Sequence, residues 1–98
     1  MKKKNKDKAT GVLFLADDSI KALEFKGSHV TLKEMQKCVG GYIELIYLND
    51  GMVLVVNEEG LILNLPYNER ATIFATALEG KEHHIVGDVL LIDANFIK

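Results

Sequence analysis

The 98-residue chain contains one cysteine, one proline and no tryptophan. A single cysteine excludes an internal disulfide, so an apolar core has to hold the fold. No apolar run approaches the ~20 residues that span a bilayer. The apolar stretch at 12–16 ends at two aspartates, and it is too short for the core of a signal peptide. We therefore expect a cytoplasmic protein that has no membrane partner.

Motifs of the common catalytic and cofactor-binding classes are also missing. The chain has no glycine-rich phosphate loop, no paired-cysteine zinc spacing, no serine nucleophile motif and no helical His-Glu motif. His83 and His84 are adjacent, so an extended chain points them in opposite directions and they cannot form one metal-binding face. We expect no cofactor, no metal and no catalytic residue, and we favour a binding protein over an enzyme.

The formal net charge of −2 combines two unlike parts of the chain. Five of the twelve basic residues and one of the fourteen acidic residues lie in the first eight positions. Residues 9–98 therefore hold seven basic and thirteen acidic side chains, a net charge of −6. Residues 1–10 are predicted to be a disordered basic tail, and residues 11–98 a single domain. Lysines without arginines or aromatics make weak, salt-sensitive phosphate contacts, so nucleic acid is not an expected partner.

Periodicity and turn residues predict the first elements. Extended runs are expected at 12–16 and 20–26. For residues 20–26 a short helix that Asp17 caps and Gly27 ends is the alternative, and a short helix follows in either case. Thr31 and Glu34 have the spacing of a capping box, in which each side chain satisfies a free amide of the other residue. Cys38 lies near the end of this helix, where the helix dipole disfavours a thiolate, and we interpret it as a packed thiol.

The central part of the chain predicts a meander of three antiparallel strands, at residues 42–48, 52–57 and 61–65. Asn68 then caps a second helix that ends at Gly80, and residues 85–93 form the last strand. These elements predict an α+β domain. Its mostly antiparallel sheet has about five or six strands, and both helices pack on one face of the sheet.

Both faces of the predicted meander are apolar. One face, which must pack on the helices, holds Ile43, Leu45, Tyr47, Val53, Val55, Leu61, Leu63 and Leu65. The opposite face holds Tyr42, Glu44, Ile46, Leu48, Met52, Leu54, Val56, Ile62 and Asn64. That second face is too apolar to contact only solvent. Either the chain itself or a homodimer partner covers it, or another protein or a small ligand docks there.

Three short signatures resemble one known family. They are Gly-Gly-Tyr-Ile-Glu at 40–44, Asn-Glu-Glu-Gly at 57–60 and Leu-Pro-Tyr-Asn at 65–68. Together they resemble a family of small bacterial domains of unknown function, which occur largely in Gram-positive bacteria and on their phages, plasmids and conjugative elements. The resemblance covers most of the chain outside the lysine-rich start. It implies a mobile-element setting and no particular reaction.

Polar residues in and near these signatures give the predicted binding site, which consists of Glu44, Asn57, Glu58, Asp88 and the only arginine, Arg70. We expect a non-catalytic binding or accessory module that engages an unidentified protein or small molecule. The alternative is a small hydrolase or nucleotide-processing enzyme. In that enzyme Glu44 or Asp88 would act as a base while Arg70 holds an anion, which requires these side chains to converge in one pocket.

Overall fold

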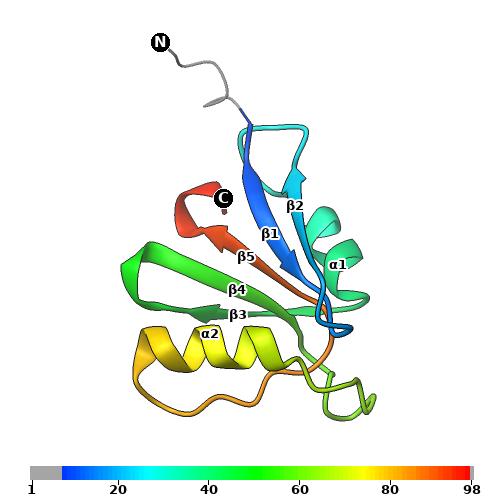
Figure 1. The fold of residues 1–98 in the computed structure, drawn as a ribbon. Coiled ribbons are helices and arrows are strands. Elements are labelled where there is room, and N and C mark those ends of the chain that lie inside the picture. Colours follow the sequence, from blue (N-terminus) through cyan, green and yellow to red (C-terminus); the bar gives the residue numbers. More distant parts are fainter. Residues whose placement is uncertain (1–7, 98) are drawn as a thin grey trace.

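A five-stranded antiparallel sheet lies between two helices (Figure 1). The structure is a computed structural model and describes residues 8–97. Its strands are β1 (Thr10–Phe14), β2 (Ile20–Glu24), β3 (Ile43–Tyr47), β4 (Met52–Asn57) and β5 (Val89–Asp93). Their order in the sheet is β2-β1-β5-β4-β3. The helices are α1 (Leu32–Val39) and α2 (Glu69–Glu79), and the arrangement confirms the predicted α+β class.

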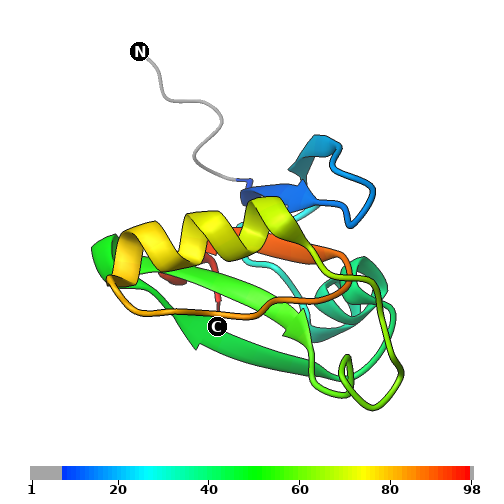
Figure 2. The same cartoon turned by 60° about the horizontal axis from the view of Figure 1, so that its bottom comes forward.

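The two helices pack on opposite faces of the sheet, as Figure 2 shows, so the prediction of both helices on one face is wrong. Met35 and Val39 of α1 pack on one set of buried side chains from β4 and β5, namely Val53, Val55, Leu90 and Ile92. Ala71 and Ala75 of α2 pack on the alternate set, Leu54, Val56, Val89 and Leu91. Because β4 and β5 are apolar on both faces, each face of the sheet needs a helix to cover it.

Local capping signals correctly predict where the helices begin and end. The Thr31 hydroxyl accepts the Glu34 amide at 3.1 Å, and the Glu34 carboxylate accepts the Thr31 amide at 2.8 Å. Gly40 follows α1 in the left-handed conformation with φ 80°, which glycine adopts without a steric penalty. The Asn68 side chain caps α2, and Gly80 ends it.

The predicted three-strand meander is only partly correct. Residues 43–47 and 52–57 pair as the hairpin of β3 and β4, with Leu48 opposite Met52 as predicted. The run 61–65 forms turns instead of a strand. The reason is that β5, more than thirty residues later in the chain, pairs with the free edge of β4 that a third meander strand would have used.

The sheet begins earlier than the predicted boundary between tail and domain. Residues 1–7 of the predicted tail lie outside the described residues. Ala9 is fully buried, its N–H donates to the Gly27 carbonyl at 2.8 Å, and its carbonyl accepts the Phe25 amide at 2.9 Å. Thr10 is the first residue of β1, so both residues belong to the folded domain.

Two truncated chains test this boundary. Relative to a chain that begins at Lys8, a chain that begins at Thr10 lacks the two hydrogen bonds of Ala9. Each such bond contributes on the order of 1 kcal/mol, so the shorter chain should be less stable by about 2 kcal/mol. Urea denaturation of both chains measures the difference. Equal midpoints would show that Ala9 adds nothing to the fold.

The half-buried Cys38 thiol is expected to react slowly. Burial raises the pKa of the Cys38 thiol, the nearby Glu34 carboxylate raises it further, and Lys37 offsets part of this effect. At pH 7.5 the thiolate fraction is therefore smaller than in the unfolded chain, and the thiolate is the reactive form. Alkylation by iodoacetamide should have a higher midpoint pH in the native protein than in the urea-unfolded protein. An equal or lower native midpoint would contradict this.

Candidate functional site

A compact loop of residues 58–65, here called the tip loop, follows β4. The buried Asn57 side chain organises its start, since Nδ2 donates to the Val39 carbonyl at 3.1 Å and Oδ1 accepts the Glu59 amide at 2.8 Å. Backbone hydrogen bonds then close the turns, with the Leu63 amide donating to the Glu59 carbonyl at 2.8 Å. The tip loop is therefore held by defined contacts at both its start and its middle.

Gly60 lets the tip loop approach the segment that leads into β5. A Cβ atom at this position would lie 2.7 Å from Cγ2 of Val86, closer than real Cβ atoms approach their neighbours. Only glycine fits there without a shift of the loop or of Val86. This close contact explains why a glycine stands within the Asn-Glu-Glu-Gly signature.

Three consecutive aliphatic side chains of the tip loop are exposed to solvent. Leu61 is 72% exposed and Ile62 is 84% exposed, and Leu63 is also exposed. We call Leu61, Ile62 and Leu63 the apolar tip. Tyr42 and Tyr67 on adjacent segments are exposed as well. Scattered exposed leucines are ordinary, but a continuous exposed apolar run is typical of an interaction site.

A hollow of about 340 Å³, here called the tip hollow, lies between the apolar tip and the sheet. Glu44 of β3 and Glu58 of the tip loop supply its two carboxylates. Its remaining lining residues are Ile46, Val56, Asn57, Gly60, Leu61, Ile62, His84, Ile85 and Val86. The His84 ring also stacks on Tyr67, with the ring centroids 5.0 Å apart. The tip hollow thus combines an apolar lining with two acidic groups.

The structure brings three of the five predicted site residues together. Glu44, Asn57 and Glu58 all line the tip hollow. Asn57 already uses its amide group to hold the Val39 carbonyl and the Glu59 amide, so its role there is structural. Glu44 and Glu58 are exposed, and they make no side-chain hydrogen bond within the described part of the chain, so their carboxylates can receive a ligand.

The other two predicted site residues lie around the turn between β1 and β2. Asp88 accepts the Ala16 amide at 2.9 Å. Arg70 donates from Nε to the Asp18 carbonyl at 2.8 Å, and its Nε lies 3.9 Å from the Asp18 carboxylate. Neither residue lines the tip hollow. The convergence of Glu44 with Asp88 and Arg70 that the enzyme alternative requires is therefore not found in residues 8–97.

The sequence interpretation missed the apolar tip and His84. It assigned Leu61 and Leu63 to a buried sheet face, whereas both are exposed. One available signal was the pair of acidic residues followed by glycine at 58–60, which permits a closed loop as well as a hairpin turn. His84 reaches the site through the stacking on Tyr67, and no short-range pattern in the sequence specifies that contact.

The chemistry of the tip hollow favours a cationic and partly apolar ligand. In the part of the chain that the structure describes, no lysine or arginine lines it, so no described basic side chain neutralises its two carboxylates from within the hollow. Within residues 8–97, no three His, Cys, Asp or Glu side chains are grouped in a way that could hold a metal ion. A lysine or arginine side chain satisfies both properties, because its aliphatic stem packs on apolar surface while its charged end reaches a carboxylate.

These features define a small α+β domain that has its sheet between two helices and an acidic, partly apolar surface site beside the tip loop. The chain belongs to the family described as Domain of unknown function (DUF3846), whose sequence profile matches residues 10–96. This confirms the resemblance to a domain family of unknown function. Searches of curated proteins and of solved structures gave no match. In residues 8–97, no helix has the length and apolar character needed to cross a membrane.

Proposed function

We propose that the domain is a non-catalytic protein-binding module, acting in the cytoplasm, whose binding site is the tip hollow together with the apolar tip. The observation that carries this proposal is the meeting of two carboxylates, Glu44 and Glu58, with the exposed Leu61 and Ile62 around one hollow. The partner is a protein segment in which a lysine or arginine stands next to apolar residues.

The two kinds of contact have different roles in this binding. Removing a large aliphatic side chain from water contributes about 1.5–3 kcal/mol, so the burial of Leu61 and Ile62 supplies most of the affinity. Charge pairs at an accessible site add less affinity, but they select the partner and speed its association. Glu44 and Glu58 therefore determine that the segment is basic.

Selection from a random peptide library tests this proposal. Peptides that bind the wild-type domain should combine a basic residue with adjacent apolar residues. The double variant L61S/I62S and the double variant E44Q/E58Q should each bind a selected peptide at least tenfold more weakly by calorimetry. E69Q/E82Q is the matched control, because both of its glutamates are exposed and lie outside the tip hollow. Equal binding by E44Q/E58Q and the control would contradict the proposal.

The sequence resemblance supports a second part of the proposal, that the module serves a mobile genetic element. The domain would then be an accessory protein that engages a protein of the element or of its host. The position of the gene tests this part. A location among phage, plasmid or conjugation genes is expected, and a location among unrelated housekeeping genes would contradict it.

A further inference from the structure

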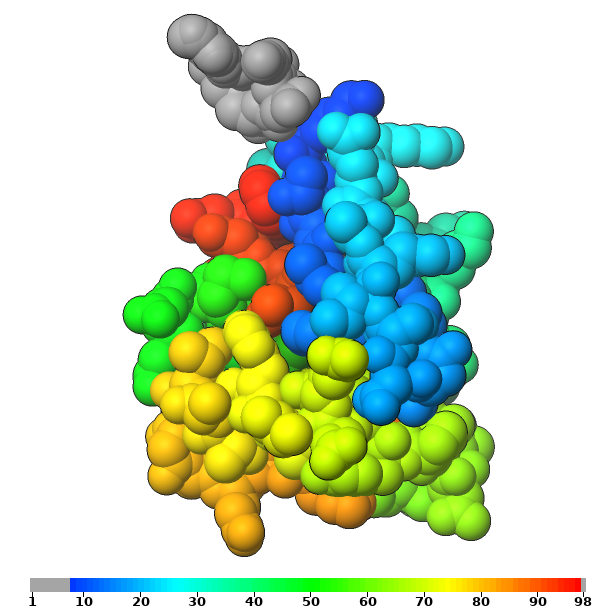
Figure 3. All heavy atoms as spheres, in the orientation of Figure 1, coloured from blue at the N-terminus to red at the C-terminus, as the bar shows by residue number. Residues whose placement is uncertain are grey.

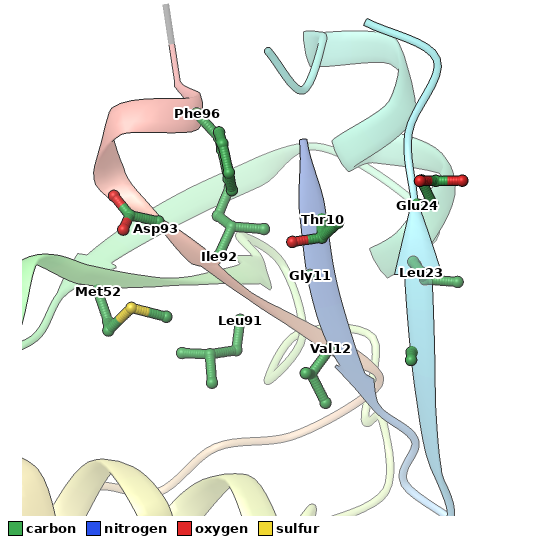
Figure 4. A pocket seen from close by; sticks show the side chains of 11 residues that line it. Thr10, Gly11, Val12, Leu23, Glu24, Met52, Leu91, Ile92, Asp93 and Phe96 are labelled. Atoms are coloured by element: carbon green, nitrogen blue, oxygen red, sulfur yellow. The ribbon is translucent and has the colours of Figure 1, made fainter. Parts of the chain in front are cut away.

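The sheet face under α2 is covered over only part of its width. The side chains of α2 pack over β4 and β5 and, through Phe74, on Phe14 at the end of β1. A hollow of about 630 Å³, here called the sheet hollow, remains over β2, β1 and β5 (Figure 4). In Figure 3, α2 (yellow) lies below and to the left of β1 and β2 (blue to cyan) and leaves most of these two strands uncovered. The sheet hollow does not share a lining residue with the tip hollow.

Two rows of side chains cross the sheet hollow. The first row is apolar, and the strand register orders it as Ala22, Val12 and Leu91, beyond which Leu54 is already covered by α2. The second row lies two residues further along the strands and points to the same face, with Glu24 beside Thr10 and Asp93 beside Met52. Because Gly11 pairs with Ile92, Thr10 lies next to Asp93 in this second row.

Thr10 therefore lies between two carboxylates. Neighbouring strands are about 4.8 Å apart, so Glu24 and Asp93 each stand about one strand spacing from Thr10. Figure 4 shows Glu24 and Asp93 on opposite sides of Thr10. The Asp93 carboxylate is turned toward the helical turn that follows β5, where its Oδ1 accepts the Asn95 amide at 2.8 Å and its Oδ2 carries no protein hydrogen bond among residues 8–97. Among residues 8–97, no lysine or arginine lines the sheet hollow. A cation above Thr10 would thus be attracted by both carboxylates, with its neighbouring apolar residue on Val12 and Leu91.

The dimensions of the sheet hollow match those of one helix. From β2 to β5 there are two strand spacings, about 10 Å, and an α-helix with its side chains is about 10 Å in diameter. The two rows are two residues apart along a strand, about 7 Å. Positions four residues apart on a helix are separated by about 6 Å along its axis. A helix could therefore place an apolar residue on the first row and a basic residue on the second.

We propose that the sheet hollow binds an amphipathic helix of a partner protein, in which a lysine or arginine follows an apolar residue by one helical turn. Such a helix would lie beside α2 and complete the helical layer on this face of the sheet. It would cover the exposed Ala22 and the half-buried Val12, and its basic residue would lie between Glu24 and Asp93. This binding surface is separate from the tip hollow, so it stands or falls independently of the proposed function.

A pair of synthetic helical peptides tests the proposal. Both peptides carry leucines along one face of the helix. One turn after each leucine, the lysine peptide has lysine and the glutamate peptide has glutamate. Titration into ¹⁵N-labelled protein, with amide shifts followed by NMR, identifies the contacted residues. Titrations in the L61S/I62S background separate this surface from the tip hollow. The lysine peptide should shift the amides of Val12, Ala22 and Leu91, and should bind at least tenfold more tightly than the glutamate peptide.

Variants of β2 give the matched comparison. Glu24→Lys and Ala22→Glu should each weaken binding of the lysine peptide at least tenfold. Glu24→Lys reverses a charge at the edge of the sheet hollow, and Ala22→Glu places a larger, charged side chain inside it. Glu82→Lys and Lys21→Ala make the same changes in net charge outside the hollow and should leave binding unchanged, provided that all four variants melt cooperatively. Equal affinity for the two peptides, or shifts only in other parts of the domain, would overturn the proposal. Self-association of the wild-type domain that Ala22→Glu abolishes would also overturn the proposal, because the occupant of the sheet hollow would then be a second copy of this chain.

Discussion

Replacement of Asn68 by alanine is expected to lower the free energy of unfolding by about 3–5 kcal/mol, a large part of the roughly 5–15 kcal/mol available to a domain of this size. Asn68 is 1% exposed. Its Nδ2 donates to the carbonyls of Phe14 at 3.0 Å and Gly87 at 2.8 Å, and its Oδ1 accepts the Ala71 amide at 3.1 Å. One side chain therefore joins the end of β1, the start of α2 and the approach to β5.

The expected loss follows from what alanine leaves behind. Two buried carbonyls lose a donor, at a cost of about 1–2 kcal/mol each, and the helix loses its cap, worth about 1 kcal/mol. Asn49→Ala is the control, because Asn49 also donates to a carbonyl, that of Leu78, but is exposed. It should cost less than about 1 kcal/mol. Denaturation of both variants measures this contrast, and similar small losses would show that Asn68 does not connect the three segments.

Asn68→Asp separates the cap from the two donated bonds. Aspartate keeps an acceptor for the Ala71 amide but directs a carboxylate toward the carbonyls of Phe14 and Gly87. In the folded state these carbonyls disfavour the ionised carboxylate and raise the pKa of the new carboxyl. Between the two pKa values the unfolded state therefore binds fewer protons than the folded state. The stability of this variant relative to wild type should therefore fall as the pH rises from 4 to 7. A pH-independent difference would contradict the described contacts.

Replacement of Leu54 by alanine is expected to cost about 3–4 kcal/mol, within the range for deletion of a buried leucine side chain. Leu54 of β4 is fully buried against α2. The matched variant is Leu61→Ala, which removes the same atoms from the exposed apolar tip and should change stability by less than about 0.5 kcal/mol. Urea denaturation of the two variants gives the comparison. A large loss for Leu61→Ala would instead favour the three-strand meander predicted from the sequence.

This pair of leucines shows how far local patterns predict the fold. The capping box at Thr31 and Glu34, the hairpin turn before Met52 and the cap at Asn68 depend on residues close in sequence, and all three were predicted. The alternation of Leu54 with its neighbours also gave the correct faces of the hairpin. The fate of residues 61–65 depended on competition with the distant β5 for one strand edge, which local periodicity does not reveal.

Only the part of the candidate site that depends on local strand pairing could be predicted from the sequence. Glu44 near the start of β3, Asn57 at the end of β4 and Glu58 just after it lie at the same end of the hairpin, so the hairpin prediction already brings them near one another. No predicted strand pairing places Asp88 and Arg70 beside them, and both residues contact the turn between β1 and β2. The exposure of Leu61 and Ile62 required the tertiary structure, because the same residues would suit a buried strand.

The most direct test of the proposed binding site is a double-mutant cycle between Glu44 and the basic residue of a selected peptide, measured by calorimetry. Binding is measured for the wild-type pair, for Glu44→Gln alone, for a peptide with alanine in place of its lysine or arginine, and for both changes together. If the two groups are in contact, the second change should have little effect after the first, which gives a coupling of about 0.5–3 kcal/mol. Additive losses, with no coupling at either Glu44 or Glu58, would contradict the assignment of the tip hollow as the binding site.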